Sequence, residues 1–293
     1  MSLLAFYDYI VFEKRFSSNT QKAYKNDLES FALYCKSHFK LENFTHVEYS
    51  IIREWIVFLS SSGLKNQSIN RKCSALKSYY NFLLKIGDID KSPMQFHTQL
   101  KIEQKLAVPL TEKEFNLVIK MYDRSNFEGS RDALIMDLLY TSGMRRAELL
   151  SLTLDAIDRS NRQLRILGKR NKVRIIPLLT EIIPLIDDYI ILRNKIKNAK
   201  KNSLLFINKK GNGLNPSQIY KCVTSYLKKV STKQKVSPHI LRHTFATHLL
   251  NRGADINSIK EFLGHKSLSS TQIYAKVQLP KMKKDYINAH PRA

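Results

Sequence analysis

One group of residues with the chemistry to hold a phosphate lies around Arg145. An apolar helix is expected to end at Ser142-Gly143, and a new helix begins with Arg145 near its N-terminus. A guanidinium beside free backbone N–H groups at the positive end of a helix makes a good phosphate cradle. Glu148, one turn further on, can hold Arg145 in position. An ordinary surface pair is the alternative for these two residues taken alone.

A second group consists of basic residues in a predicted β-hairpin. Strands are expected at Gln163–Leu167 and Val173–Pro177. The turn between them is basic and contains no acid. A lysine there can enter a DNA groove and act as a general acid that protonates a departing alkoxide. A turn made basic for solubility is the alternative. The basic residues are Lys169, Arg170, Lys172 and Arg174.

A third group lies on one expected helix. Ser237 is a natural N-cap and Pro238 suits the first helical position, so His239 and Arg242 lie one turn apart on one face. His239 and His243 also have the spacing of helix-borne zinc ligands. The general-base Glu of such zinc motifs is absent, and an Arg among the ligands disfavours a cation. We therefore expect no metal here.

A fourth group follows a helix that is expected to run from about Asn257 to Gly264. His265 comes directly after this helix, and a polar break leads to a short helix that bears Tyr274. Neither residue carries a strong signal by itself. A half-buried aromatic and a surface histidine are the alternatives for these two residues taken singly.

The composition favours a polyanionic partner. The 293 residues include 49 Lys+Arg and 25 Asp+Glu, a formal net charge of +24. Neutralised phosphates release condensed counterions, so such an excess suits nucleic acid. No apolar run approaches the roughly 20 residues of a spanning helix, and no signal peptide is evident, so we expect a cytoplasmic protein with no membrane contact. Three scattered cysteines suggest neither disulfides nor a metal cluster.

The pattern of apolar residues indicates two domains. We expect a helical domain at residues 1–95, a linker at 96–108 and a larger, mainly helical domain at 109–293 with a small sheet. A capping box at Thr111 opens the second domain. The first domain should contain helices over Ser17–Cys35, from Thr45 (through a capping box with Glu48) to near Gly63, and over Ile69–Leu84. Arg71, Lys72 and Lys77 then lie towards the outer surfaces of the last of these helices.

The four groups together resemble the signature segments of one family. TSGMRRAEL, GKRNK, HILRH and LGHKSLSSTQIY are similar to segments of the tyrosine recombinases, in the family's order and near its spacings. SSNTQKAYKNDL and INRKCSALKSYYNFLL resemble the family's N-terminal core-binding domain. The terminal AHPRA resembles the Xer recombinases, which resolve chromosome dimers. The resemblance implies a mainly α fold with a small antiparallel sheet: a SAM-like domain of four to five helices and a catalytic domain.

The resemblance also implies a mechanism that needs no metal or other cofactor. Tyr274 attacks the scissile phosphate to give a 3′-phosphotyrosine and a free 5′-hydroxyl. Two guanidiniums bind the phosphate oxygens and stabilise the charge of the transition state. A lysine protonates the leaving oxygen, one histidine assists deprotonation of the phenol and another hydrogen-bonds the phosphate. The two guanidiniums are those of Arg145 and Arg242, and the lysine is Lys169. His239 is the histidine that assists the phenol, and His265 is the one that hydrogen-bonds the phosphate.

The partners implied are a double-stranded recombination site and further protomers. Four protomers of the family assemble on two sites, alone or with a sister recombinase, and pass a C-terminal helix to a neighbour. Val277 to Ile287 can supply that helix, or it can dock on its own chain. Activation by a DNA translocase such as FtsK stays open. The expected DNA contacts outside the catalytic group are Arg71, Lys72, Lys77, Arg170, Lys172 and Arg174.

Three other functions compete with chromosome dimer resolution. A recombinase of a mobile element or an invertible segment has the same chemistry. A DNA-binding module that lost catalysis has no need of a tyrosine such as Tyr274, and all six catalytic positions are filled here. A type IB topoisomerase shares the attack on phosphorus but lacks a recombinase-like N-terminal domain. The sequence therefore favours a recombinase of the Xer type.

Overall fold

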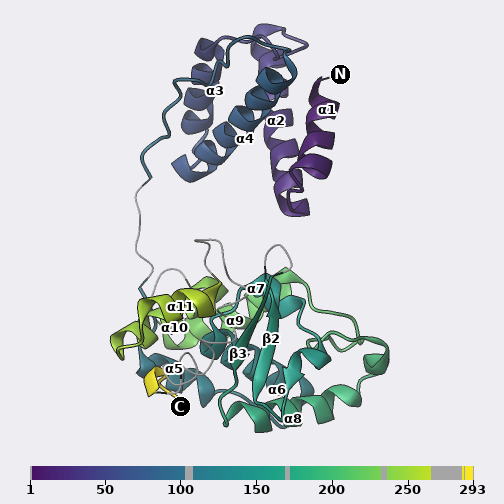
Figure 1. The fold of residues 1–293 in the computed structure, drawn as a ribbon, viewed down its shortest axis with the longest axis vertical. Helices are drawn as coiled ribbons and strands as arrows, with labels where there is room; N and C mark the ends of the chain where they lie inside the picture. The colour runs from purple at the N-terminus through teal and green to yellow at the C-terminus, as the bar shows by residue number, and fades with distance from the viewer. Residues whose placement is uncertain are drawn as a thin grey trace. The chain divides into compact units, whose positions relative to one another are not determined.

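The computed structural model describes residues 2–102, 108–168, 172–231, 236–264, 286 and 288–292 (Figure 1). The chain divides into two compact units, residues 1–105 and 106–293. Both units are mainly helical, and the sheet found among the described residues is a small antiparallel one in the second unit. This confirms the predicted fold class. None of the described helices combines the length and apolar character of a membrane span.

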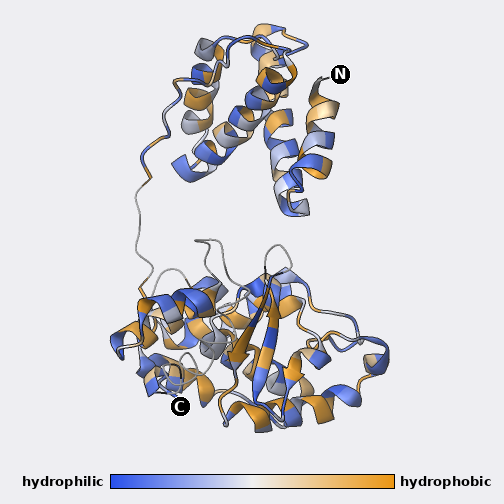
Figure 2. Ribbon diagram, viewed as in Figure 1, coloured by the Kyte–Doolittle hydropathy of each residue, from blue (hydrophilic) through white to orange (hydrophobic). Residues whose placement is uncertain are grey.

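The first unit is a helical bundle around an aromatic core. Trp55 is buried against Phe31, with ring centroids 4.8 Å apart, and Tyr80 donates a hydrogen bond from its hydroxyl to the carbonyl of Phe44 (2.7 Å). Figure 2 shows apolar and polar residues alternating along its helices, as amphipathic helices require. The elements are α1 (Ser2–Asp8), the π-helical turn η1 (Tyr9–Glu13), α2 (Ser18–Phe39), α3 (Tyr49–Ser61) and α4 (Asn66–Ile86).

The helix ends of the first unit confirm one predicted start and correct another. Ser17 caps α2 by accepting a hydrogen bond from the N–H of Thr20 (3.3 Å). The predicted start at Thr45 is wrong, because the N–H and hydroxyl of Thr45 both donate to the side chain of Asn43 in the preceding turn (2.8 and 2.6 Å). Helix α3 therefore begins only after Glu48, whose side chain forms no capping bond.

The second unit is built around α6 (Phe127–Ser142), which is buried on all sides over most of its length. It packs against α8, α9 and α10. The predicted capping box at Thr111 is present, at the start of α5. The other elements are α5 (Glu112–Ile119), α7 (Arg146–Leu150), η2 (Leu154–Ala156), β1 (Ile157–Asp158), β2 (Gln163–Leu167), β3 (Val173–Pro177), α8 (Ile182–Asn194), η4 (Ala199–Lys201), α9 (Pro216–Val230), α10 (Pro238–Asn251) and α11 (Ile256–Leu263).

The sheet has the strand order β1-β2-β3, and β2 and β3 have the predicted bounds. Leu167 pairs with Val173 at the open end of this antiparallel pair, and the N–H of Gly168 donates to the carbonyl of Lys172 (2.8 Å). These contacts close the base of the predicted hairpin. Its tip, residues 169–171, lies outside the described residues.

The described C-terminal residues pack on the second unit of their own chain. The buried Tyr286 donates a hydrogen bond from its hydroxyl to the carbonyl of Thr141 on α6 (2.8 Å). Arg292 forms an ion pair with the buried carboxylate of Asp137 on α6, and the side chain of His290 is also buried. The described part of the AHPRA segment, residues 289–292, is thus tied to α6 through Arg292. The segment predicted to pass to a neighbour falls outside the described residues except for Tyr286.

Candidate active site

The end of α6 places Arg145. Gly143 ends the helix in the left-handed conformation, with φ +57°, and a Cβ there would lie 2.5 Å from the ring of Phe245. Glycine is therefore required both for its backbone angle and for the close approach of α10. The N–H of Met144 donates to the hydroxyl of Ser142 (3.2 Å), and Arg145 occupies the N-cap position of α7. The predicted change of helix at this point is confirmed.

Glu148 fixes Arg145 from the first turn of α7. Its carboxylate is buried, with 6% of the side chain exposed. It accepts a hydrogen bond from the backbone N–H of Arg145 (2.8 Å) at Oε2 and one from Arg145 Nη1 (3.0 Å) at Oε1. Charge-assisted bonds to one carboxylate from both the backbone and the side chain of an arginine leave little freedom for that guanidinium.

Arg174 holds the same carboxylate from the other side. It comes from β3, and its side chain is 13% exposed. Arg174 Nη2 lies 2.7 Å from Glu148 Oε2, and Nη1 lies 3.1 Å from Oε1. This is the two-pronged pairing of guanidinium with carboxylate. Residue spacing gave no signal for this contact, because the two residues are 26 positions apart and lie in different elements.

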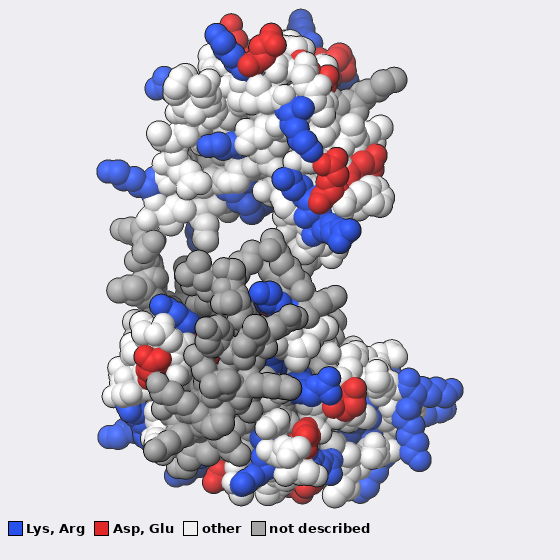
Figure 3. Space-filling view, viewed as in Figure 1, with Lys and Arg blue, Asp and Glu red and all other residues white. Residues whose placement is uncertain are grey.

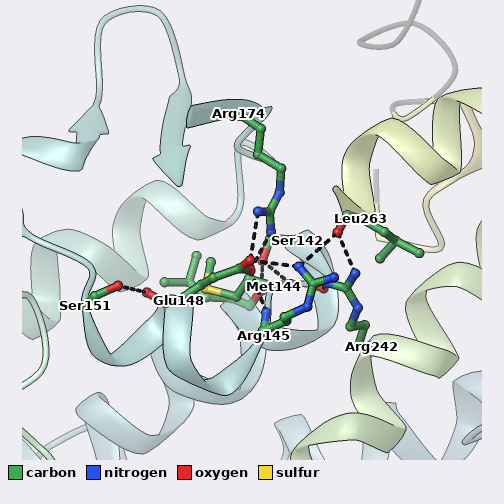
Figure 4. Close-up of polar contacts among 10 residues, drawn as sticks. Ser142, Met144, Arg145, Glu148, Ser151, Arg174, Arg242 and Leu263 are labelled. Atoms are coloured by element: carbon green, nitrogen blue, oxygen red, sulfur yellow. Dashed lines mark hydrogen bonds and ion pairs between the residues drawn. The ribbon is translucent and has the colours of Figure 1, made fainter. Parts of the chain in front are cut away.

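Arg242 lies beside Arg145. It projects from α10 and donates from Nη1 to the carbonyl of Gly143 (2.6 Å) and from Nη2 to the carbonyl of Leu263 (2.5 Å). Arg145 Nη1 donates to the same Leu263 carbonyl (3.5 Å). Figure 4 shows the two guanidiniums converging on this oxygen, at the last residue of α11. Two arginines 97 positions apart in the chain are thus within reach of one small anion.

The electrostatics of this cluster favour an anion. Burial lowers the pKa of Arg242 to about 10, and the positive charges of Arg145 and Arg174 act in the same direction against the opposing charge of Glu148. Burial alone would raise the pKa of Glu148, but hydrogen bonds from Arg174 and from the Arg145 N–H keep it below its ordinary value. Among the described residues, two guanidiniums pair with one ionised carboxylate and the guanidinium of Arg242 lies beside them, which leaves an excess of positive charge.

Helix α10 also places the predicted histidines. Ser237 and Pro238 occupy the N-cap and first positions as predicted, although the Ser237 hydroxyl makes no capping bond. His239 is exposed on the first turn, and His243 is exposed one turn later. Among the described residues, no three His, Cys, Asp or Glu side chains are grouped so that they could hold a metal ion.

Several predicted residues lie outside the described part of the chain. Lys169 and Arg170 belong to the hairpin tip, and His265 and Tyr274 follow the end of α11. The described neighbours are in place: Lys172 is exposed at the base of the hairpin, and Gly264 ends α11 with φ +61° as predicted. The structure thus brings Arg145, Arg174 and Arg242 together. Lys169, Arg170, His265 and Tyr274 lie outside the described residues.

Two of the three predicted DNA contacts of the first unit are paired with a buried acid. Asp27 on α2, with 2% of its side chain exposed, forms ion pairs with Arg71 and with Lys72 (3.2 Å) of α4. The ammonium of Lys72 also lies 5.7 Å from the centre of the Trp55 ring. Lys77 is exposed. Contact of these residues with DNA stays a prediction, while the acid that holds two of them was not recognised in the sequence.

Comparisons with known proteins decide the family. The model of the phage integrase family matches residues 108–279, and that of its N-terminal SAM-like domain matches residues 3–87. The chain belongs to the phage integrase family. It is 36% identical over 282 residues to the tyrosine recombinase XerC of Staphylococcus carnosus, covering 96% of this chain and 94% of that protein. The XerC of Pelotomaculum thermopropionicum is 34% identical over 296 residues, covering 97% of this chain and 96% of that one.

A solved structure agrees with this assignment. The recombinase XerH, bound to a palindromic difH substrate in a post-cleavage complex, superposes with a TM-score of 0.68 at 25% identity, covering 90% of this chain and 78% of that one. The protein is therefore a site-specific tyrosine recombinase, an enzyme that cleaves and rejoins DNA. Its Lys and Arg side chains are spread over both units (Figure 3), in keeping with a DNA-binding enzyme.

Proposed function

We propose that this recombinase works as an Xer-type enzyme in chromosome dimer resolution and cuts DNA through Tyr274 without a metal. The phenol oxygen of Tyr274 forms a bond to the scissile phosphorus, and the bond from phosphorus to the 5′-oxygen breaks. Lys169 gives its proton to that 5′-oxygen, His239 assists removal of the phenol proton, and His265 hydrogen-bonds the phosphate. The 3′-phosphotyrosine link conserves the bond for rejoining.

The observation that carries this proposal is the shared position of Arg145 and Arg242. Both guanidiniums donate to the carbonyl of Leu263, two residues before His265. A phosphodiester is anionic, and its pentavalent transition state carries still more charge. Two fixed guanidiniums offer the charge stabilisation that a metal ion supplies in other phosphoryl-transfer enzymes.

The assembly follows from the same proposal. Four protomers bind two recombination sites, either as one kind of chain or together with a sister recombinase, and exchange their C-terminal segments. Likeness to XerC over nearly the whole chain supports this role on chromosomal DNA in the cytoplasm. A DNA translocase of the FtsK kind is a candidate activator.

Recombination of a mobile element or an invertible segment is the second candidate. The chemistry is the same, and the solved Tn1549 transposon integrase shares the fold, with a TM-score of 0.73 at 20% identity. Likeness to XerC over nearly the full length of both chains favours the Xer role.

A nicked suicide substrate tests the chemistry. When a short fragment is released beside the cut, religation fails and the covalent protein–DNA adduct accumulates. We expect adducts with the wild type in excess chelator and none with Tyr274→Phe. Denaturing gels of labelled DNA measure this directly. Equal adducts from both proteins would remove Tyr274 from its role, and complete loss in chelator would refute the metal-free mechanism.

A further inference from the structure

Arg174 was expected to contact DNA, but its surroundings indicate another role. Both outer nitrogens of its guanidinium are engaged by Glu148, at 2.7 and 3.1 Å, and its side chain is largely buried (Figure 4). A phosphate contact needs donors that are free to face the backbone of the duplex. The donors of Arg174 that face Glu148 are not free in this way.

The contacts of Arg174 reach three segments of the predicted site. Through Glu148 it is linked to the backbone and side chain of Arg145. A Cβ at Gly168 would lie 3.5 Å from Arg174 Nη1, and one at Gly264 would lie 3.6 Å from the same atom. Gly168 and Gly264 are the last described residues before Lys169 and His265. The guanidinium of Arg174 thus lies close to Gly168 and Gly264, and it is linked to Arg145 through Glu148.

The charges give this contact a function. A buried carboxylate with Arg145 as its single partner would compete with the substrate phosphate for that guanidinium. Arg174 occupies both oxygens of Glu148 and neutralises its charge, which leaves the positive charge of Arg145 for the substrate. A second cation on the acid therefore increases the net charge that the two phosphate-binding arginines present.

We propose that Arg174 is a positioning residue for cleavage: through Glu148 it orients Arg145 and keeps the charge of Arg145 available to the scissile phosphate. The proposal rests on the proposed function, since Arg145 must bind that phosphate. Arg174 itself touches neither the phosphate nor the DNA backbone. It acts on the rate of cleavage and leaves the affinity for DNA unchanged.

Single-turnover cleavage of the suicide substrate at saturating DNA separates the two roles. We expect the rate to fall about 10²-fold in Arg174→Ala, because small misplacement of a group that binds the reacting phosphate has effects of this size. Arg174→Lys should lose nearly as much, because an ammonium cannot form the two-pronged pair with Glu148. Arg165→Ala is the matched control, an exposed arginine of β2 in the same sheet, and should cleave at the wild-type rate.

A double-mutant cycle tests whether Arg174 acts through Glu148. In a Glu148→Gln background, Arg174→Ala should lower the rate by less than about threefold, because its intermediary is already changed. A merely structural role predicts that the two losses multiply instead. Thermal unfolding of each variant, measured without DNA, identifies any variant whose lower rate reflects loss of the folded state.

The salt dependence of DNA binding tests whether Arg174 contacts a phosphate of the DNA instead. Each phosphate contact contributes about 0.9 to the slope of log K against log salt. We expect Arg174→Ala to keep the wild-type slope. A slope reduced by about 0.9, together with a cleavage rate near that of the wild type, would overturn the proposal and make Arg174 a DNA contact. If the wild type forms no adduct, the proposed chemistry fails, while the slope still decides whether Arg174 contacts phosphate.

Discussion

One buried carboxylate in each unit is surrounded by basic side chains. The two clusters differ in how much positive charge remains for a ligand. Asp27 is held by Arg71 and Lys72, which are neighbours on α4. Glu148 is held by Arg145 and Arg174, and Arg242 lies next to them on backbone carbonyls. The first cluster joins two helices. The second joins α7, β3, α10 and the end of α11.

The difference teaches how a structural ion cluster can be told from a phosphate site. Around Asp27, two cations converge on the acid, and Lys72 also packs over Trp55, so its ammonium is used within the unit. Around Glu148, the third guanidinium, that of Arg242, pairs with no acid among the described residues and is oriented by the carbonyls of Gly143 and Leu263. A cation fixed by carbonyl groups keeps its full charge for a ligand.

The largest effect is expected from the arginines that face the phosphate. Arg242→Ala should lower the rate of adduct formation at saturating DNA by about 10²–10³-fold, the usual loss when one such donor is removed. Arg145→Ala should lose as much. Rapid-quench measurement with the suicide substrate gives these rates. A fall of less than tenfold in either variant would mean that this cluster does not stabilise the transition state.

A smaller effect, on a different property, is expected for the first cluster. Asp27→Asn removes the buried charge that holds Arg71 and Lys72, and should lower the stability of the first unit by about 1–3 kcal/mol. The cleavage rate at saturating DNA should stay within about threefold of the wild type. Urea unfolding measures the first quantity. A loss of cleavage comparable to that of Arg242→Ala would erase the distinction between the two clusters.

The smallest effect is a pH dependence of stability. The pKa of Glu148 is lowered in the folded protein, so its ionised form contributes stability that is fully present above its ordinary pKa and is lost as the pH falls through the folded value. The difference in unfolding temperature between the wild type and Glu148→Gln should therefore shrink below the ordinary glutamate pKa of 4.5. Calorimetry from pH 7 to pH 3 measures it, and a constant difference over that range would contradict the role of the charge.

Local features of the fold could be predicted because their signals are local. The hairpin strands, the helix start at Ser17, the capping box at Thr111 and the helix break at Gly143 each depend on a few adjacent residues. The start predicted at Thr45 failed for the same reason, since Asn43, just outside the capping pattern, competes for its N–H. Such competition between nearby side chains is common for Ser, Thr, Asn and Asp.

The contacts that make the site could not be predicted from spacing. Arg145 and Arg242 were recognised as candidates, but the carbonyls that orient Arg242 belong to Gly143 and Leu263, and a backbone carbonyl has no sequence signature. Arg174 was assigned to DNA because it stands in a basic hairpin. Only the ion pair between β3 and α7 in the structure shows that its charge is directed to Glu148.

Replacement of the scissile phosphate by a neutral methylphosphonate tests the central claim most directly. If Arg242 acts by neutralising the charge of the phosphate, the loss of about 10²–10³-fold predicted for Arg242→Ala must depend on that charge. On the neutral substrate, Arg242→Ala should form adducts within about tenfold of the wild-type rate. An equal loss on the charged and the neutral substrates would contradict the account.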